Sequence, residues 1–199
     1  LSNHTTIWLD INIPKDCKPG VYKLTVKMKS TSLGDYEGFE VFEVMRINVL
    51  DVEMPEQKTL FTQWFHTDCI ANYYKVPVFS PRHWELIDRF MKTAVDNGIN
   101  MILTPIFTPP LDTAIGSYRQ TMQLVDIAKD GEKYSFGFEK LERWVELCKK
   151  YGIRYFEMAH LFTQWGACAT PKIEATVDGK LTRIFGWDVA SDSPAYKNF

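Results

Sequence analysis

Two copies of one pattern constrain the fold of this chain more than any other feature of its sequence. Residues 97–112 read NGINMILTPIFTPPLD, and residues 151–166 read YGIRYFEMAHLFTQWG. Each copy contains a helix end with Gly, then an apolar strand, then a polar and aromatic segment where the strand should end. Helices that alternate with apolar strands are typical of a (β/α)8 barrel, an enzyme fold whose chemistry lies at the carboxyl ends of its strands.

The sequence from Glu56 onward continues this alternation. Ser80-Pro81 and Ser193-Pro194 are typical helix starts, with a Ser cap before a Pro at the first helical position. Two Asp-Gly pairs, at 130–131 and 178–179, each predict a tight β-hairpin. The expected strands are residues 59–65, 99–107 and 153–161, the expected helices begin near Pro81 and Glu139, and the expected hairpin strands are residues 123–128 with 133–138 and 172–177 with 180–185.

The first part of the chain has strand patterns and no helix pattern. Apolar and polar residues alternate in residues 7–13 and 21–28, and residues 39–50 form a further β-rich run. Such alternation predicts strands with one buried face. We interpret residues 1–55 as the C-terminal strands of a β-sandwich domain, with a linker at residues 51–56.

Residues 56–199 hold about three β/α units, whereas a closed barrel needs eight units and about 250 residues. We therefore expect a fragment, in which β-sandwich strands are followed by the N-terminal part of a (β/α)8, TIM-type barrel. The remainder of a longer parent chain is then an expected partner, because open strand edges and apolar faces need covering. The alternative is a self-sufficient small α/β domain.

Composition excludes several classes of function. The 23 Lys and Arg against 25 Asp and Glu give a net charge of −2, which lacks the basic surface that nucleic acids select. No apolar run approaches the roughly 18–20 residues of a membrane helix. We therefore expect neither a nucleic-acid partner nor a membrane partner. The four cysteines lie outside any metal-binding spacing and are expected to be free thiols.

Barrel geometry selects the residues just after each strand as a candidate binding site. Their types suit a sugar, because polar side chains bind hydroxyls and aromatic rings pack on the apolar face of the sugar ring. The alternative for the two histidines of this set is a packing role near the mouth of a barrel. The predicted substrate-binding residues are His66, Asp68, Thr104, His160, Gln164 and Trp165, with Tyr73, Tyr74, Thr108 and Asp112 in comparable positions.

A metal site is a weaker alternative. His66 and Asp68 from one strand end, with His160 from another, make three possible ligands. A metal-dependent barrel hydrolase is expected to have a cleaner His-x-His pair and ligands on later strands. We therefore predict no metal and no cofactor.

Other catalytic motifs give little guidance. The sequence has no Gly-rich phosphate loop, no GxSxG and no Cys/His nucleophile signature. The carboxylates Asp68, Asp112, Glu157 and Asp188 do not form an obvious pair of the kind that glycosidases place about the scissile bond. Glu157 alternates with apolar neighbours, so it points into a barrel or is a buried structural acid.

Three segments resemble glycoside hydrolase family 123, the β-N-acetylgalactosaminidase-like proteins. They are WFHTDCIANYY at residues 64–74, NGINMILTPIFTPPLDT at 97–113 and YFEMAHLFTQWGA at 155–167. KIEATVDGK and IFGWD, up to Asp188, continue the similarity. IPKDCKPGVYKLTV is similar to the closing strands of the β-sandwich that precedes the barrel in that family. The resemblance covers nearly the whole chain.

The resemblance implies a retaining, substrate-assisted hydrolysis. The 2-acetamido oxygen of the substrate attacks the anomeric carbon, an Asp orients that group, and the adjacent Glu serves as general acid and then as base. The Asp-Glu pair of the family lies on a later barrel strand, and this sequence contains no Asp-Glu dipeptide. We therefore assign no catalytic residue and carry over only the six predicted substrate-binding residues.

The expected function is that of part of a glycoside hydrolase that acts on a β-linked N-acetylhexosamine glycoside, with the 199-residue chain inactive by itself. The alternative of a different class is a non-catalytic carbohydrate-binding or structural module. The compartment stays open, because glycosidases of this architecture are often exported, whereas unpaired cysteines favour a reducing compartment.

Overall fold

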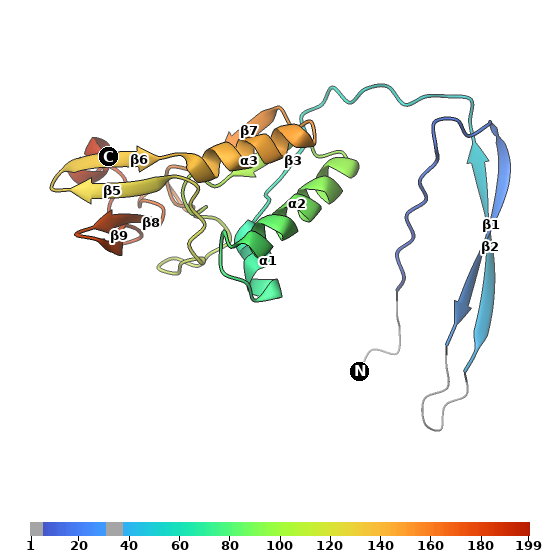
Figure 1. Ribbon diagram of the computed structural model, residues 1–199, viewed down its shortest axis with the longest axis horizontal. Helices are drawn as coiled ribbons and strands as arrows, with labels where there is room; N and C mark the ends of the chain where they lie inside the picture. Colours follow the sequence, from blue (N-terminus) through green and yellow to red (C-terminus); the bar gives the residue numbers. More distant parts are fainter. Residues whose placement is uncertain (1–5, 31–37) are drawn as a thin grey trace. The chain divides into compact units, whose positions relative to one another are not determined.

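The computed structural model describes residues 6–30 and 38–199 (Figure 1). It divides into two compact units, Leu1–Glu56 and Gln57–Phe199. The division falls at the end of the segment 51–56 that the sequence analysis interprets as a linker. The interpretation of the two parts as an incomplete sandwich and an incomplete barrel stays a prediction. Among the described residues, no helix has both the length and the apolar content to cross a membrane.

The described residues of the first unit contain an antiparallel strand pair. β1 (Gly20–Lys29) and β2 (Glu40–Val49) pair without a break, from Gly20 opposite Val49 to Lys29 opposite Glu40. These strands confirm the two expected at residues 21–28 and 39–50.

The strand expected at residues 7–13 is wrong. Residues 6–13 belong to no strand of the described chain, and Trp8 is 83% exposed. The alternation of side chains is present, but a strand also needs a neighbour for its backbone N–H and C=O groups. The parts of the chain that the structure describes place no such neighbour beside this segment.

The second unit contains the predicted alternation of strands and helices. β3 (Thr62–Gln63), β4 (Met101–Thr104) and β7 (Tyr155–Met158) form a parallel sheet in the order β3-β4-β7. α2 (Pro81–Asp96) connects the first two strands, and α3 (Glu139–Lys150) precedes the third. The strands are shorter than the apolar runs that predicted them, because backbone pairing stops before the runs end.

Both helices cover one face of this sheet. Ile102 of β4, Ile87 of α2 and Trp144 of α3 are fully buried in one cluster. The opposite face carries large half-exposed side chains, since Tyr155 is 50% exposed and Trp64, just after β3, is 46% exposed. Successive side chains of a strand point to opposite faces, so this asymmetry follows from the strand pleat.

Local capping fixes where the helices begin and end. The Ser80 hydroxyl accepts a hydrogen bond from the His83 N–H at 3.2 Å, with Pro81 at the first helical position. Asn97 ends the helix, and Gly98 follows with a φ of 90°. These contacts confirm the predicted cap and stop.

A short helix, α1 (Thr67–Tyr74), was not predicted from the sequence. Its N-cap residue, His66, makes no side-chain capping bond, and its C-cap Lys75 has a left-handed backbone with a φ of 53°. The segment therefore lacks the usual start and stop signals. It begins at the point where the first barrel strand was expected to end.

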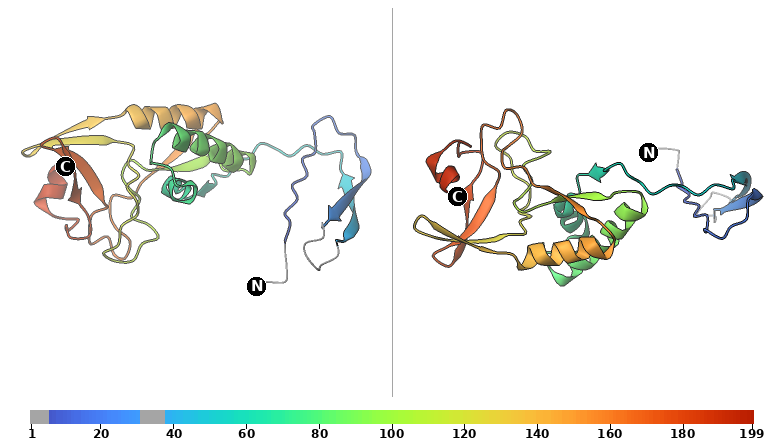
Figure 2. Two further views of the ribbon diagram at one scale, coloured as in Figure 1. Left: turned by 60° about the horizontal axis from the view of Figure 1, so that its bottom comes forward. Right: turned by 90° about the horizontal axis from the view of Figure 1, so that it is seen from above.

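The two predicted hairpins form and join into one sheet. β5 (Asp126–Asp130) pairs with β6 (Lys133–Gly137), and β8 (Ile173–Val177) pairs with β9 (Lys180–Phe185). Parallel pairing of β5 with β8 links them in the order β6-β5-β8-β9, which the sequence did not predict. Figure 2 shows this sheet at one end of the second unit and the helix-covered sheet at the other.

An aromatic cluster covers one face of the four-stranded sheet. α4 (Pro194–Asn198) begins at the predicted Ser193 cap. The rings of Tyr196 and Phe199 lie 5.1 and 5.2 Å from the ring of Phe185 on β9. The other face of this sheet has no comparable cover among the described residues.

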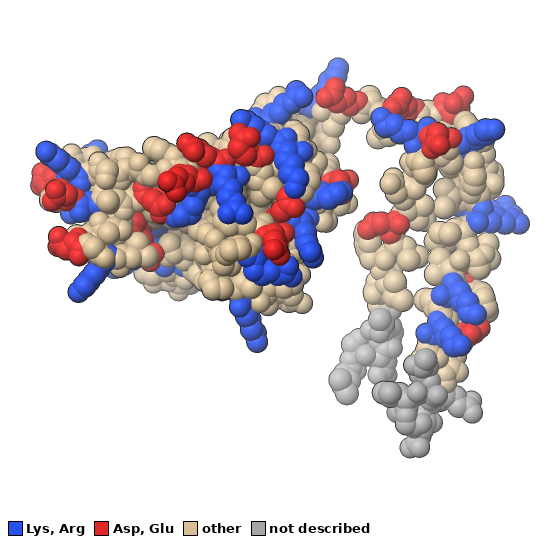
Figure 3. All heavy atoms as spheres, in the orientation of Figure 1, with Lys and Arg blue, Asp and Glu red and all other residues tan. Residues whose placement is uncertain are grey.

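Charged side chains of both signs intermingle on the visible face of the second unit (Figure 3). One group of them joins the two long helices: Asp88 of α2 accepts hydrogen bonds from Lys150 Nζ at 2.6 Å and from the Tyr151 hydroxyl at 3.0 Å. These partners hold the pKa of Asp88 below its ordinary value, with the Lys150 hydrogen bond as the main cause.

Ile87→Ala tests the helix–sheet core. The substitution should lower the free energy of unfolding by about 2–5 kcal/mol, because it removes buried methyl groups and leaves a cavity. Arg89→Ala, on the exposed side of the same helix, should change it by no more than about 0.5 kcal/mol. Urea unfolding followed by circular dichroism measures both, and equal losses would contradict the packing described above.

Candidate functional site

Side chains from the ends of the three parallel strands meet around Trp64. The Trp64 ring packs edge-on against the rings of His66 and His160, with centroids 6.4 and 6.0 Å away. Its indole N–H donates to Glu157 Oε1 at 3.3 Å, and the other oxygen of Glu157 accepts from the Thr62 hydroxyl at 3.2 Å. Parallel strands place their carboxyl ends at one edge of the sheet, which is why residues nearly a hundred positions apart come together. We refer to Trp64, His66, Asp112, Glu157 and His160 as the strand-end cluster.

His66 is paired with a carboxylate of the loop after β4. Its Nε2 lies 3.2 Å from Asp112 Oδ2, and its side chain is 11% exposed. Burial lowers the pKa of His66 below its ordinary value, and the nearby Arg119 guanidinium adds to this effect. Asp68 and Asp112 act in the opposite direction. The neutral ring with its proton on Nε2 can therefore donate to Asp112, while Nδ1 is buried without a partner among the described residues.

Asp68 is held by Arg119, whose side chain is 11% exposed. Its two oxygens accept from Arg119 Nε at 2.9 Å and from Nη2 at 3.1 Å, and Asp68 is only 3% exposed. Arg119 also donates to the Leu111 carbonyl at 3.3 Å and lies 3.0 Å from Cys69 Sγ. Its Nη1 is 4.0 Å from Asp112 Oδ2. Arg119 thus holds the backbone just before Asp112, whose left-handed φ of 57° is strained for a residue with a side chain.

The loop that carries Arg119 is itself fixed to the strand β9. The Tyr118 hydroxyl accepts from the Trp187 N–H at 3.1 Å, and the Arg183 guanidinium lies over the Tyr118 ring at 5.2 Å. A Cβ atom at Gly186 would come within 2.5 Å of both the Tyr118 hydroxyl and Arg183 Nη1. A side chain at 186 would therefore displace the Tyr118 hydroxyl or the Arg183 guanidinium, so glycine favours this contact.

A cleft of ≈ 600 Å³ opens beside the strand-end cluster. It is lined by Asp112, Thr113, Gln164 and Trp165. Trp165 is 71% exposed, so the ring that lines the cleft is accessible to a ligand. Asp112 joins the cleft to the cluster, since it contacts His66.

The loop that presents Trp165 has an unusual backbone. Trp165, Gly166 and Ala167 have consecutive left-handed φ values of 66°, 93° and 56°. Its neck is closed by Thr163, whose N–H donates to the Ala169 carbonyl at 3.0 Å and whose hydroxyl accepts from the Ala169 N–H at 3.2 Å. Non-glycine residues in this region cost on the order of 1–3 kcal/mol each and cluster at functional sites.

The structure places the six predicted substrate-binding residues in three settings. His66 and His160 contact Trp64 in the strand-end cluster, and Gln164 and Trp165 line the cleft. Asp68 and Thr104 lie in the interior. The Thr104 side chain is fully buried, and its hydroxyl donates to the Ile102 carbonyl at 3.4 Å.

Sequence reasoning did not select Arg119 or the central role of Trp64. Arg119 is a lone arginine in a long loop, 51 positions from Asp68, and no local signal marks it. Trp64 lies within the strand predicted at residues 59–65, whereas the observed β3 ends at Gln63, so Trp64 was not among the residues expected just after the strand.

Three candidate ligands for a metal were considered in the sequence, His66, Asp68 and His160. Within residues 6–30 and 38–199, no group of three His, Cys, Asp or Glu side chains is arranged to hold a metal ion. Both oxygens of Asp68 are bound to Arg119.

Comparison with known proteins gives a family and a fold. Residues 64–199 match the family model of glycoside hydrolase 123, catalytic domain. The chain is similar to the structure of a family 123 glycoside hydrolase from Clostridium perfringens, studied for glycolipid glycan hydrolysis, at 19% sequence identity and a TM-score of 0.64. The similarity covers 88% of this chain and 31% of that one, so the chain spans about a third of that protein's length. No curated protein sequence matches the chain.

Asp68→Asn should destabilise the protein strongly. It removes the buried charge that pairs with Arg119 and leaves only the more exposed Asp112 carboxylate 4.0 Å away. Loss of one partner of a buried pair costs about 3–5 kcal/mol in comparable cases. Asp112→Asn changes the same group where the side chain is 58% exposed, and should cost no more than about 1 kcal/mol. Urea unfolding of the two variants compares them, and a small effect of Asp68→Asn would argue against the pair.

His66 should titrate below its ordinary pKa of 6.5. Asp112→Asn should lower this pKa further, because the carboxylate favours the charged ring. In the window between the lowered pKa and 6.5, the unfolded chain binds more protons than the folded one, so the contribution of His66 to stability rises with pH. An NMR titration of the ring, assigned with His66→Gln, measures the pKa, and a value above 6.5 would refute the assignment.

Proposed function

The chain belongs to glycoside hydrolase family 123, and from this we propose that it supplies part of the sugar-binding site of a glycosidase that acts on β-linked N-acetylhexosamines, N-acetylgalactosamine in particular. The observation that carries the proposal is the strand-end cluster beside a cleft with an exposed tryptophan. Family membership supports glycoside hydrolysis in general. The choice of sugar rests on the resemblance to the β-N-acetylgalactosaminidase-like members.

The architecture we propose is the N-terminal part of a (β/α)8 barrel after the last strands of a β-sandwich. Three features support the barrel: β3, β4 and β7 are parallel and in sequence order, helices cover one face, and half-exposed side chains occupy the other. In a barrel this second face is the packed interior. The half-exposed Tyr155 and Trp64 would then pack against further strands.

Three of the four side chains that line the cleft have properties that suit a sugar. The Trp165 indole offers a flat apolar surface for the C–H face of a pyranose. Gln164 has both a donor and an acceptor for ring hydroxyls, and Asp112 has acceptors. Neutral His66 fixes the Asp112 carboxylate through Nε2. Asp68 is proposed to act indirectly, because it holds Arg119 and hence the backbone at Asp112.

The chemistry we propose is substrate-assisted hydrolysis with retention. The residues of this chain bind and orient the sugar, and Glu157 holds Trp64 against the two histidines. The nucleophile is the acetamido oxygen of the substrate, and an Asp-Glu pair is needed to orient it and to move the proton. Because this sequence has no Asp-Glu dipeptide, we propose that the 199 residues alone do not catalyse the reaction.

Hydrolysis of chromogenic substrates tests this function. The polypeptide encoded by the complete coding region should release 4-nitrophenol from 4-nitrophenyl β-N-acetylgalactosaminide. It should not act on the β-galactoside, which lacks the acetamido nucleophile. The 199-residue chain should act on neither. Saturable sugar binding without turnover by the longer polypeptide would instead favour a non-catalytic carbohydrate-binding module.

Two exposed tryptophans provide a matched pair for the same assay. Trp165→Ala should raise the KM by about tenfold, which corresponds to the loss of about 1.4 kcal/mol of stacking. Trp8→Ala removes a ring that is 83% exposed in the first unit and should leave the KM unchanged. An unchanged KM for Trp165→Ala would remove this residue from the site.

A further inference from the structure

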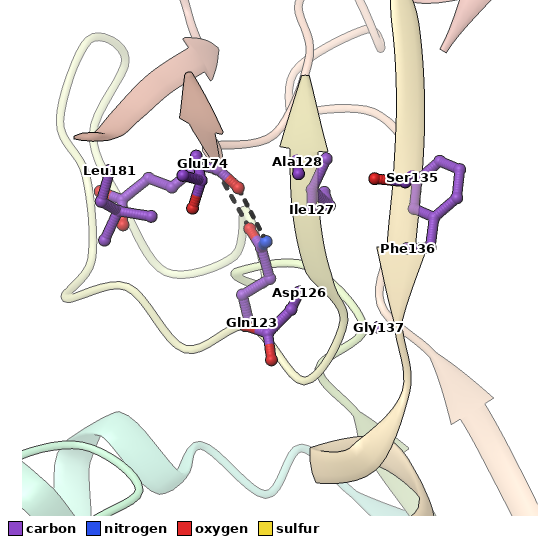
Figure 4. A pocket seen from close by; sticks show the side chains of 10 residues that line it. Gln123, Asp126, Ile127, Ala128, Ser135, Phe136, Gly137, Glu174 and Leu181 are labelled. Carbon is purple, nitrogen blue, oxygen red and sulfur yellow. Dashed lines mark hydrogen bonds between the residues drawn. The ribbon is translucent and has the colours of Figure 1, made fainter. Parts of the chain in front are cut away.

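We propose that the open face of the four-stranded sheet is a second carbohydrate site, which binds one neutral sugar unit apart from the cleft. A cavity of ≈ 330 Å³ lies there (Figure 4). Its volume is within the range of small-molecule sites. It has no lining residue in common with the cleft of Asp112 and Trp165. The site goes beyond the proposed function, since it takes no part in bond cleavage.

Small side chains form the floor of this cavity. Ala128 of β5 lies opposite Ser135 of β6 on one side and Thr176 of β8 on the other. Gly137 lies opposite Asp126, and a Cβ atom at Gly137 would meet Asp126 Cβ at 3.3 Å. Directly paired residues share a face of a sheet. The small residues of three neighbouring strands therefore leave a trough where long polar side chains usually cover an exposed sheet.

A buried glutamine keeps the trough open at one end. β5 and β8 pair only at two positions, Ala128 with Thr176 and Lys129 with Val177. Beyond them, Gln123 bridges the two strands: its Nε2 donates to the Glu174 carbonyl at 2.9 Å, and its Oε1 accepts from the Glu174 N–H at 3.1 Å. Figure 4 shows these two bonds as dashed lines. Gln123 is 8% exposed, so the side chain that separates the two strands is part of the packed structure.

The charges at the trough are balanced, which favours a neutral ligand. Asp126 is paired with Lys140, and Glu174 lies 3.4 Å from Lys172 Nζ. Each carboxylate thus comes with a nearby ammonium group, so that acceptors and donors occur side by side. A sugar hydroxyl both donates and accepts hydrogen bonds and therefore matches such pairs. A charged ligand would be repelled by as many of these groups as attract it.

Two free hydroxyls and an apolar side chain at the edge of the trough also suit a sugar. The side-chain hydroxyls of Ser135 and Thr176 have no hydrogen-bond partner among the described residues and are exposed. Leu181, which lies opposite Thr176, is 71% exposed. Polar groups on the strands and an aliphatic side chain at the edge suit a pyranose, whose hydroxyls surround an apolar ring face.

Saturation-transfer NMR tests the proposal on the polypeptide encoded by the complete coding region, with lactose as the probe. Thr176→Arg places a long side chain in the trough and should weaken lactose binding by at least about tenfold, because it fills the space of the ligand and removes the Thr176 hydroxyl. Thr182→Arg is the matched control, because Thr182 is an exposed strand residue of β9 that does not line the cavity. It should leave binding unchanged. Both variants should retain turnover of the aryl β-N-acetylgalactosaminide.

A further variant separates the two sites. Trp165→Ala should leave the lactose signal in place, because the probe binds at the trough. Three outcomes would each overturn the proposal. They are loss of the lactose signal in Trp165→Ala, an equal lactose signal in Thr176→Arg and wild type, and no lactose signal at all. The comparison of Thr176→Arg with Thr182→Arg does not depend on turnover, so it stands even if the proposed hydrolysis fails.

Discussion

The ion pair between buried Asp68 and the largely enclosed Arg119 is the interaction on which the candidate site depends. Two charges taken out of water are tolerated only where their hydrogen bonds are nearly all satisfied. Here both oxygens of Asp68 are used, and Arg119 also reaches the Leu111 carbonyl. The geometry of the pair therefore fixes α1 relative to two parts of the long loop after β4: the part at Leu111 and Asp112, and the part that carries Arg119. Asp112 and His66 derive their positions from this arrangement.

The second constraint is that the long segments after β4 and β7 stabilise each other. Each contains a hairpin, and a hairpin alone is marginally stable in water. The parallel contact of β5 with β8 makes a four-stranded sheet, which buries Ile173 and Ala175 completely. In this way the two segments that leave the helix-covered sheet form one stable four-stranded sheet. The loops of Tyr118 and Trp187, which lie against it, gain a fixed support.

Features set by neighbours in the sequence were predictable. Ser80, Asn97-Gly98 and the two Asp-Gly turns gave the helix limits and both hairpins, because caps and tight turns depend on a few adjacent residues. Features set by distant partners were not. The Asp68–Arg119 pair and the β5–β8 contact join residues about fifty positions apart, and residues 6–13 have the alternation of a strand without a neighbour.

The candidate site shows the same difference between features set by the local sequence and features set by distant partners. The choice of residues after each predicted strand selected His66, His160, Gln164 and Trp165, which lie at the cluster or the cleft. Their role in substrate binding stays a prediction. The same choice gave no sign that Thr104 is fully buried, as are Ile102 and Leu103 on the two faces of β4. Trp165 belongs to a loop already closed at its neck by Thr163 and Ala169. Its conformational entropy is therefore lost when the protein folds, and a ligand that stacks on the ring has little further ordering to offset.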